Sequence, residues 1–269
     1  MADSRKSKKT RGPRRSSAEL RQLLISTGQE IIRSEGLGTG VDGVTFKKVL
    51  NRIKERDGIT VTHASFLGRI FENQAEFQGV VLAELVSTIN NAEFSDVAAV
   101  VVPLLETVDL HSLKSRRHTL NEISRLGAIA EEATIRNDPS WPIWLSVVAS
   151  ELTSRDSLGH NLKERLNGVL RQETADFAML YGEILKFLGM RIKAHFTIEN
   201  LTVAIASIAE GAAMRSFVAP DIFTPVALSS SESGTTTEWT ILGLGIRALS
   251  ELMVEPIPGW TPPDEFDVA

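Results

Sequence analysis

The 269-residue chain contains no cysteine. Disulfides, a thiol nucleophile and a zinc site with cysteine ligands are therefore excluded, and the composition fits a reducing compartment. No uninterrupted apolar run approaches the roughly 18 residues of a membrane span. The N-terminus is basic and polar, without the apolar core of a signal peptide. From these features we predict a soluble, cytoplasmic protein that has no membrane partner.

The sequence also lacks a recognisable catalytic constellation. Its five histidines form neither the H-E-x-x-H pattern of zinc proteases nor the E-x-x-H pattern of di-iron bundles. There is no P-loop and no G-x-S-x-G nucleophile motif. The adjacent acids Glu131 and Glu132 are expected on a solvated face. We therefore predict no catalytic residue, no cofactor and no metal site.

Charge is distributed unevenly along the chain. Residues 1–78 hold 15 Lys+Arg and 9 Asp+Glu, whereas residues 79–269 hold 14 Lys+Arg and 25 Asp+Glu. Seven of the basic residues lie within residues 1–16, which have nothing to bury and are expected to be disordered. A basic N-terminal region followed by an acidic body predicts a polyanionic partner for the first part only.

Residues 44–77 predict a helix, a turn and a second helix. The apolar residues of the first helix recur at helical spacing, namely Phe46, Val49, Leu50 and Ile53. Asp57-Gly58 should end this helix, because glycine tolerates the positive φ of a sharp turn. Thr60 or Thr62 can then cap the second helix. Its inward face is expected to consist of Phe66, Leu67, Ile70 and Phe71. A plain helical hairpin with a solvated basic face is the alternative.

The rest of the chain predicts helices without clear strands. Ser16 and Glu19 match a capping box, and Thr197 should cap an apolar helix over 198–218. Residues 221–237 are expected to form a Ser/Thr-rich loop, with a last helix over 238–254. The fold class is therefore all-α. The predicted organisation is a disordered basic arm (1–15), a helix-turn-helix DNA-binding domain (16–78), a larger helical domain (79–255) and a flexible tail (256–269).

The order LRQLLISTGQEIIRSEG, a glycine-rich loop, VTFKKVL and ITVTHASFLGRIFENQAEFQGVVL resembles the DNA-binding domain of the tetracycline-repressor (TetR) family over about residues 16–82. Phe71, Asn73 and Phe77 occupy positions of the family pattern. Leu67-Gly68 replaces its usual tyrosine, and Gln74 replaces a lysine. The resemblance implies a three-helix head and a helical effector-binding and dimerisation domain over residues 79–255. It also implies a ligand-responsive repressor that binds double-stranded DNA as a homodimer.

The basic and polar residues of the head are the expected DNA contacts. The arm can follow phosphates or enter a minor groove, and the second helix can lie in a major groove. The candidates are Arg11, Arg14, Arg15, Thr45, Lys47, Lys48, Thr60, Thr62, His63, Ala64, Ser65, Arg69 and Gln74. The resemblance places the homodimer interface on the last two helices, 198–218 and 238–254, although both could simply be core helices.

An effector pocket is expected among the middle helices, lined by apolar and aromatic side chains that suit an apolar or aromatic ligand. The candidates are Trp141, Trp144, Leu145, Val148, Phe177, Tyr181 and Met214. Aromatic residues at helical spacing also occur as ordinary core residues. Two other classes of function therefore stay open: a helical adaptor that binds only protein, and a helical enzyme without a known motif.

Overall fold

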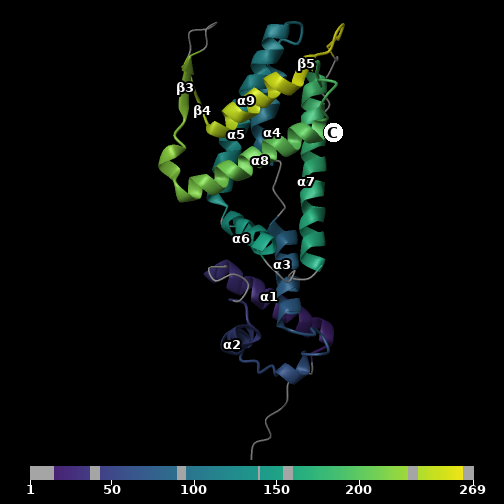
Figure 1. Cartoon of the computed structure of the whole chain (residues 1–269), viewed down its shortest axis with the longest axis vertical. Coiled ribbons are helices and arrows are strands. Elements are labelled where there is room, and N and C mark those ends of the chain that lie inside the picture. Colours follow the sequence, from purple (N-terminus) through teal and green to yellow (C-terminus); the bar gives the residue numbers. More distant parts are fainter. Residues whose placement is uncertain are drawn as a thin grey trace, which may run out of the picture. The chain divides into compact units, whose positions relative to one another are not determined.

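The computed structural model describes residues 15–36, 43–89, 95–138, 140–153, 160–229 and 236–262. These residues fold mostly into α-helices, which confirms the all-α class (Figure 1). The chain divides into two compact units. The N-terminal unit comprises Met1–Ser87 and Ser146–Arg165, and the C-terminal unit comprises Thr88–Leu145 and Leu166–Ala269. Residues 146–165, which the sequence assigned to the second domain, thus group with the first unit.

Local capping defines the first two helices of the N-terminal unit. Ser16 begins α1 (Ser17–Glu35) with the predicted capping box, in which its hydroxyl accepts from the Glu19 backbone and the Glu19 side chain accepts from Ser16. Thr45 caps α2 (Phe46–Asp57) by accepting from the Lys48 backbone. Gly58 ends α2 at φ 67°, the left-handed conformation that glycine adopts without steric cost.

A cluster of phenylalanines forms the centre of this unit. Phe46 lies 4.8 Å, centroid to centroid, from both Phe66 and Phe77, and Phe77 lies 5.1 Å from Phe71. Phe77 belongs to α3 (Gln74–Ile89), which begins where the Asn73 side chain accepts from the Glu76 backbone. α1 approaches α3 closely at Gly28, where a Cβ would press against Val81. The cluster therefore joins α2, the turn after it and α3 into one core.

The second helix of the predicted helix-turn-helix is absent from the described chain. Residues 63–65 form only a short 3₁₀ turn, η1 (His63–Ser65), and the Thr62 side chain makes no capping hydrogen bond. The physical reason is Gly68, whose φ of 72° separates a turn closed by Leu67 N–H to His63 O from one closed by Ile70 N–H to Phe66 O. Phe66 and Phe71 are buried as predicted, but Leu67 is 42% exposed, so its inward assignment was wrong.

The C-terminal unit is a helical body with a continuous apolar core. Its helices include α4 (Ser95–Glu106), α5 (Leu113–Asn137), α8 (Ile198–Val218) and α9 (Ile241–Met253). α6 (Ser140–Thr153) and α7 (His160–Phe187) contribute residues to both units. α5 packs against α4 and α9, and α8 packs against α9 (Figure 1). The core residues are Val101, Leu105, Ile184, Leu185, Leu188, Met190, Leu201, Ile205 and Met253.

Two short strands attach the C-terminal segment to this body. β2 (Met190–Ile192) pairs antiparallel with β5 (Val254–Pro256). Beyond β5, Ile257 N–H donates to Gly189 O at 2.9 Å, and Trp260 lies 4.6 Å from the Arg116 guanidinium. The predicted flexible tail is therefore wrong for residues 256–262. Arg191 pairs with Glu255, and a pairing over such a separation leaves no local pattern in the sequence.

A second strand pair replaces part of the predicted Ser/Thr-rich loop. After α8 come a 3₁₀ turn, η2 (Pro220–Ile222), and β3 (Val226–Ser229), which pairs antiparallel with β4 (Thr236–Trp239). The last helix begins at Ile241, where Thr240 caps it, and not at Glu238. Trp239 consequently belongs to a strand, while its side chain is still buried.

Among the described helices, one is long and apolar enough to cross a membrane, namely α8. A single helix of this kind is weak support for a membrane span, because the core helices of soluble proteins can have the same length and composition. α8 carries the capping box of Thr197 and Asn200, contributes Leu201 and Ile205 to the core, and packs against α9. These contacts make α8 part of the core of the C-terminal unit.

Candidate functional site

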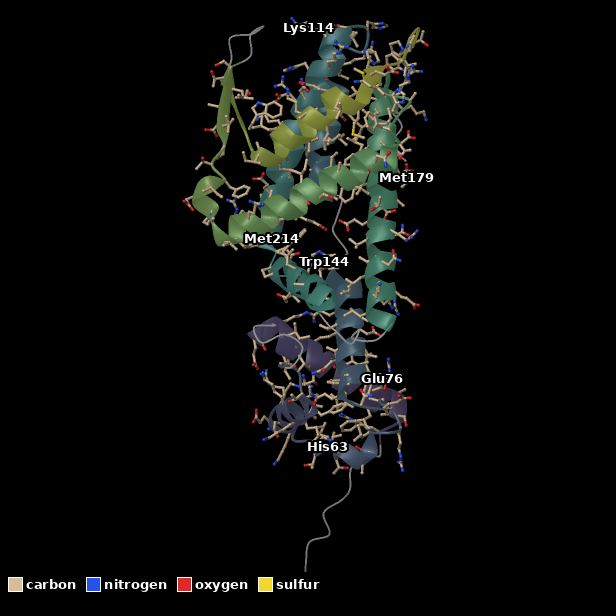
Figure 2. The ribbon with its side chains drawn as sticks, viewed as in Figure 1. His63, Glu76, Lys114, Trp144, Met179 and Met214 are labelled. Carbon is tan, nitrogen blue, oxygen red and sulfur yellow. The ribbon has the colours of Figure 1, made fainter. Side chains whose placement is uncertain are left out.

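Residues 58–71 follow α2 and carry several exposed polar side chains. This stretch contains no aspartate or glutamate. The predicted DNA contacts within it are all exposed, namely Thr60, Thr62, His63, Ala64, Ser65 and Arg69. Figure 2 shows His63 in the turn that follows α2. Without carboxylates, nothing in this stretch repels a phosphate backbone electrostatically.

Two buried phenylalanines fix this exposed stretch on the core. Phe66 and Phe71 have relative exposures of 0% and 1%. The His63 ring lies 5.5 Å from the Phe66 ring and 5.9 Å, edge-on, from Phe46. The Ser65 hydroxyl donates to Thr62 O, which closes the turn. The stretch is thus held by aromatic packing and turn hydrogen bonds instead of by a regular helix.

The basic face of α2 is largely neutralised by acids. Lys48 pairs with Glu35, and Arg52 reaches Glu35 at 2.9 Å. Arg56 pairs with Asp57 at 2.8 Å and also with Glu30. Lys48 holds the pKa of the Glu35 carboxyl below its ordinary value, and Arg56 does the same for Asp57. These cations therefore link α2 to α1, which leaves Lys47 exposed beside them.

Two other predicted DNA contacts have structural partners. The Thr45 hydroxyl accepts from Lys48 N–H as the cap of α2. Gln74 Oε1 accepts from Phe46 N–H at 3.3 Å, so this side chain is directed at the start of α2. Arg15 is exposed at the start of the described chain. Arg11 and Arg14 lie outside the described residues, as does the rest of the predicted arm.

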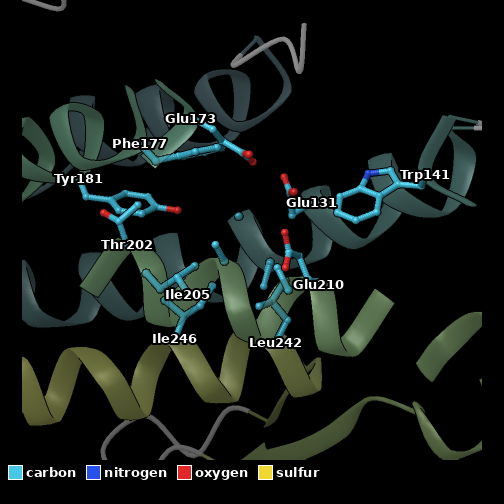
Figure 3. A pocket seen from close by; sticks show the side chains of 14 residues that line it. Glu131, Trp141, Glu173, Phe177, Tyr181, Thr202, Ile205, Glu210, Leu242 and Ile246 are labelled. Carbon is cyan, nitrogen blue, oxygen red and sulfur yellow. The ribbon is translucent and has the colours of Figure 1, made fainter. Parts of the chain in front are cut away.

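The C-terminal unit contains a cavity of about 80 Å³. Small side chains leave this space between α5, α7, α8 and α9 (Figure 3). Its lining consists of Gly127, Ala128, Glu131, Trp141, Glu173, Phe177, Tyr181, Thr202, Ile205, Ala206, Ala209, Glu210, Leu242 and Ile246. The cavity brings together Trp141, Phe177 and Tyr181 of the predicted ligand-binding residues.

The other four predicted ligand-binding residues do not line this cavity. Trp144 is buried, Leu145 is half-buried, and Val148 belongs to the N-terminal unit. Met214 is 53% exposed towards the end of α8 (Figure 2). Sequence periodicity could identify apolar side chains on these helices, but it could not separate those that face a cavity from those that face the core or water.

Sequence reasoning missed three glutamates that line the cavity. Figure 3 shows the carboxylates of Glu131, Glu173 and Glu210 directed into the same space. Burial raises the pKa of Glu131 and of Glu210 above the ordinary value of a glutamate. Glu131 was expected on a solvated face, which is wrong. The available indication was Glu210, an acid in the middle of the strongly apolar α8.

The phenol of Tyr181 adds a hydroxyl to the apolar groups and carboxylates that line this cavity. Burial raises the pKa of its phenol, and the nearby carboxylates of Glu131 and Glu173 raise it further. Its ring lies 5.7 Å from Phe177. Figure 3 shows the Tyr181 oxygen directed towards the cavity. The site therefore combines carboxylates, a phenol hydroxyl and aromatic faces around one cavity.

Comparisons with known proteins add no family assignment. No protein-family model matches the chain, and no curated protein matches it.

Proposed function

We propose that this chain is a DNA-binding transcriptional regulator, with the N-terminal unit as the DNA-binding head and the C-terminal unit as a ligand-responsive body. The observation that carries this proposal is the exposed, acid-free stretch of residues 58–71, anchored by Phe66 and Phe71 directly after the capped helix α2. A polar surface on a rigid support is what a protein needs to approach base edges and phosphates. The resemblance to the TetR family supports the same assignment.

Within this proposal, Arg69, His63 and the hydroxyls of Thr60, Thr62 and Ser65 contact DNA. Lys47 supplies a phosphate contact from α2, because it is exposed and its neighbour Lys48 is paired with Glu35. Arg11, Arg14 and Arg15 supply the sequence-independent part of the attraction. Lys48 and Gln74 have a smaller part in binding than their sequence positions suggest, since both make contacts inside the head.

The proposal includes a homodimer through α8 and α9. Both helices carry large apolar side chains at the surface, and such surface commonly marks an interface. These residues are Val203, Met214, Phe217, Val218, Ile241 and Leu252. Two heads related by a twofold axis would bind a near-palindromic site with half-sites about 34–36 Å apart. Sedimentation that shows a monomer at micromolar concentration would remove the interface from the proposal.

The first experiment is selection of duplex fragments from a genomic pool at several salt concentrations. We expect retention of a near-palindromic fragment with a steep dependence of affinity on salt. The test variant is Arg69→Ala, which should reduce discrimination between the selected fragment and a scrambled one. Retention without sequence preference, lost at moderate salt, would contradict the proposal and favour a protein-binding adaptor.

A further inference from the structure

Two glutamines of α3 hold the segment at which the chain enters α2. The Gln78 side chain donates from Nε2 to the carbonyl oxygen of Val44 at 3.1 Å. Gln74 lies one turn earlier, and its Oε1 accepts from the N–H of Phe46 at 3.3 Å. Residues four apart lie on the same face of a helix. One face of α3 therefore contacts the backbone on both sides of Thr45, the residue that caps α2.

The contact between Gln78 and Val44 is buried. Gln78 is 5% exposed and Val44 is 3% exposed, so both polar groups are shielded from water. An apolar side chain of similar length could fill the space of Gln78, but it would leave the Val44 carbonyl without this donor. A hydrogen bond depends on direction, whereas apolar packing does not. The buried amide therefore fixes the path of the chain into α2.

The first residue of α2 is held in two ways. Phe77 lies between the two glutamines in the sequence of α3, and its ring stacks on Phe46 at 4.8 Å, centroid to centroid. Gln74 adds the hydrogen bond to the backbone of Phe46. The N–H groups of the first turn of a helix have no acceptor within that helix. Gln74 supplies the acceptor from α3, so the first turn of α2 is tied to α3 by packing and by direction.

We propose that Gln74 and Gln78 are positioning residues for DNA binding, which fix the N-terminal end of α2 on α3 and thereby orient Lys47 towards a phosphate. Lys47 is exposed and directly follows Phe46, so the path of its side chain depends on how the first turn is held. Binding groups need support that keeps them close to the productive geometry. Neither glutamine contacts DNA itself. This inference rests on the proposed function.

Amide hydrogen exchange of the full chain, measured by NMR without DNA, tests the contact between α3 and α2. Gln74→Met removes the acceptor of the Phe46 N–H, which should then exchange about tenfold faster. Gln74→Glu keeps an acceptor oxygen on a side chain of the same length, so it should retain the protection of Phe46. Unchanged exchange of Phe46 in Gln74→Met would overturn the proposal.

Combination with Lys47→Ala tests the positioning role. The probe is the duplex fragment that the wild type retains from the genomic pool, titrated at four salt concentrations. Lys47→Ala should reduce the slope of log affinity against log salt by about 0.9 in the wild type. In the double variant Gln74→Met, Gln78→Met the same change should have less than half this effect, because Lys47 no longer reaches its phosphate. A merely structural role of the glutamines would leave the effect of Lys47→Ala unchanged, and that result would overturn the proposal.

Two further variants complete the comparison. Gln74→Met alone gives the same test where loss of the buried Gln78 contact prevents folding, since Gln74 is only half-buried. The matched control is Gln22→Met, an exposed position on α1 of the same unit. It should leave the effect of Lys47→Ala at the wild-type value. An equal reduction in Gln22→Met would show that the change is not specific to α3 and would also overturn the proposal.

The proposed function and this inference fail in different ways. A wild-type chain that retains no fragment contradicts the regulator and, with it, the positioning role. Retention by the wild type, with an unchanged effect of Lys47→Ala in the glutamine variants, contradicts the positioning role and leaves the regulator.

Discussion

In the N-terminal unit, Lys48, Arg52 and Arg56 lie against carboxylates of α1 and α2, whereas in the C-terminal unit Glu131 and Glu210 lie in a cavity without a cation in its lining. The consequences for acidity are opposite. The pKa of Glu35 and of Asp57 is lowered by paired cations, and the pKa of Glu131 and of Glu210 is raised by burial.

This difference separates charges that stabilise the fold through ion pairs from charges that burial disfavours. A paired surface carboxylate has its partner within the chain and contributes little beyond positioning two helices. An unpaired carboxylate in a cavity reduces stability until a proton or a ligand compensates it. Groups that reduce stability without an obvious structural benefit are concentrated at functional sites.

The largest expected effect is a loss of stability in the N-terminal unit. Phe66→Ala should destabilise the N-terminal unit by about 3–5 kcal/mol, because Phe66 is fully buried in the phenylalanine cluster. Its neighbour Leu67 is 42% exposed, so Leu67→Ala should cost about 0.5 kcal/mol or less. Hydrogen exchange resolved by peptide measures both. Equal loss of protection in the two variants would restore the regular second helix expected from the sequence.

The second effect concerns the buried acids. The double variant Glu131→Gln, Glu210→Gln should stabilise the C-terminal unit at pH 7, because it removes two carboxylates whose charged form is disfavoured by burial. The gain should be on the order of 1 kcal/mol, or about 2–4 °C in Tm. Tryptophan fluorescence is the suitable probe, since all four tryptophans (141, 144, 239 and 260) lie in this unit. A lower Tm would show that these carboxylates have structural partners.

The third prediction is that the stabilities of the two units depend on pH in opposite directions. Glu35 and Asp57 have lowered pKa values, so their contribution is present above the pKa of the unfolded chain and is lost as pH falls through the folded value. Glu131 and Glu210 have raised pKa values, so their contribution is present at low pH and is lost as pH rises through the folded value.

Acidification from pH 7 towards pH 4.5 should therefore weaken the ion pairs of the N-terminal unit slightly and increase the stability of the C-terminal unit. Urea unfolding followed by tryptophan fluorescence reports the second change, and it should disappear in the double glutamine variant. The same stabilisation in the wild type and in that variant would assign the pH dependence to other groups.

The smallest effect concerns two adjacent lysines. Lys47→Ala should reduce the slope of log affinity for DNA against log salt by about 0.9, the value for one phosphate contact. Lys48→Ala should change the slope less, because Lys48 is paired with Glu35. Gel-shift titrations at four salt concentrations measure both. A larger change for Lys48→Ala would mean that this pair opens when DNA binds.

Local sequence patterns were sufficient for several structures that close within about four residues. Ser16 and Thr197 cap the helices that the sequence predicted for them. Each cap is a contact with a backbone N–H three residues ahead, so the necessary groups lie together in the sequence. The all-α class followed from the same periodicity. The prediction that Leu67 faces inward was wrong, because the positive φ of Gly68 interrupts the helix on which that prediction depended.

Contacts over longer separations were beyond the sequence. The pairing of β2 with β5, the stacking of Trp260 on Arg116, and the convergence of Glu131, Glu173 and Glu210 each join segments from about 40 to 144 residues apart. The sequence also did not show that Lys48 and Arg52 are paired. They were expected on an unpaired basic face, but in the structure they pair with Glu35 and Glu30 of α1.

The sequence by itself determined most of the helices, the caps at Ser16 and Thr197, the absence of cysteine chemistry and the basic character of the N-terminal region. These features depend on composition and on neighbours within a few residues. Only the tertiary structure decided which charges are paired and which are not. Burial and pairing depend on which side chains the other helices bring to the same place, and they decide whether a charged carboxylate stabilises or destabilises the fold.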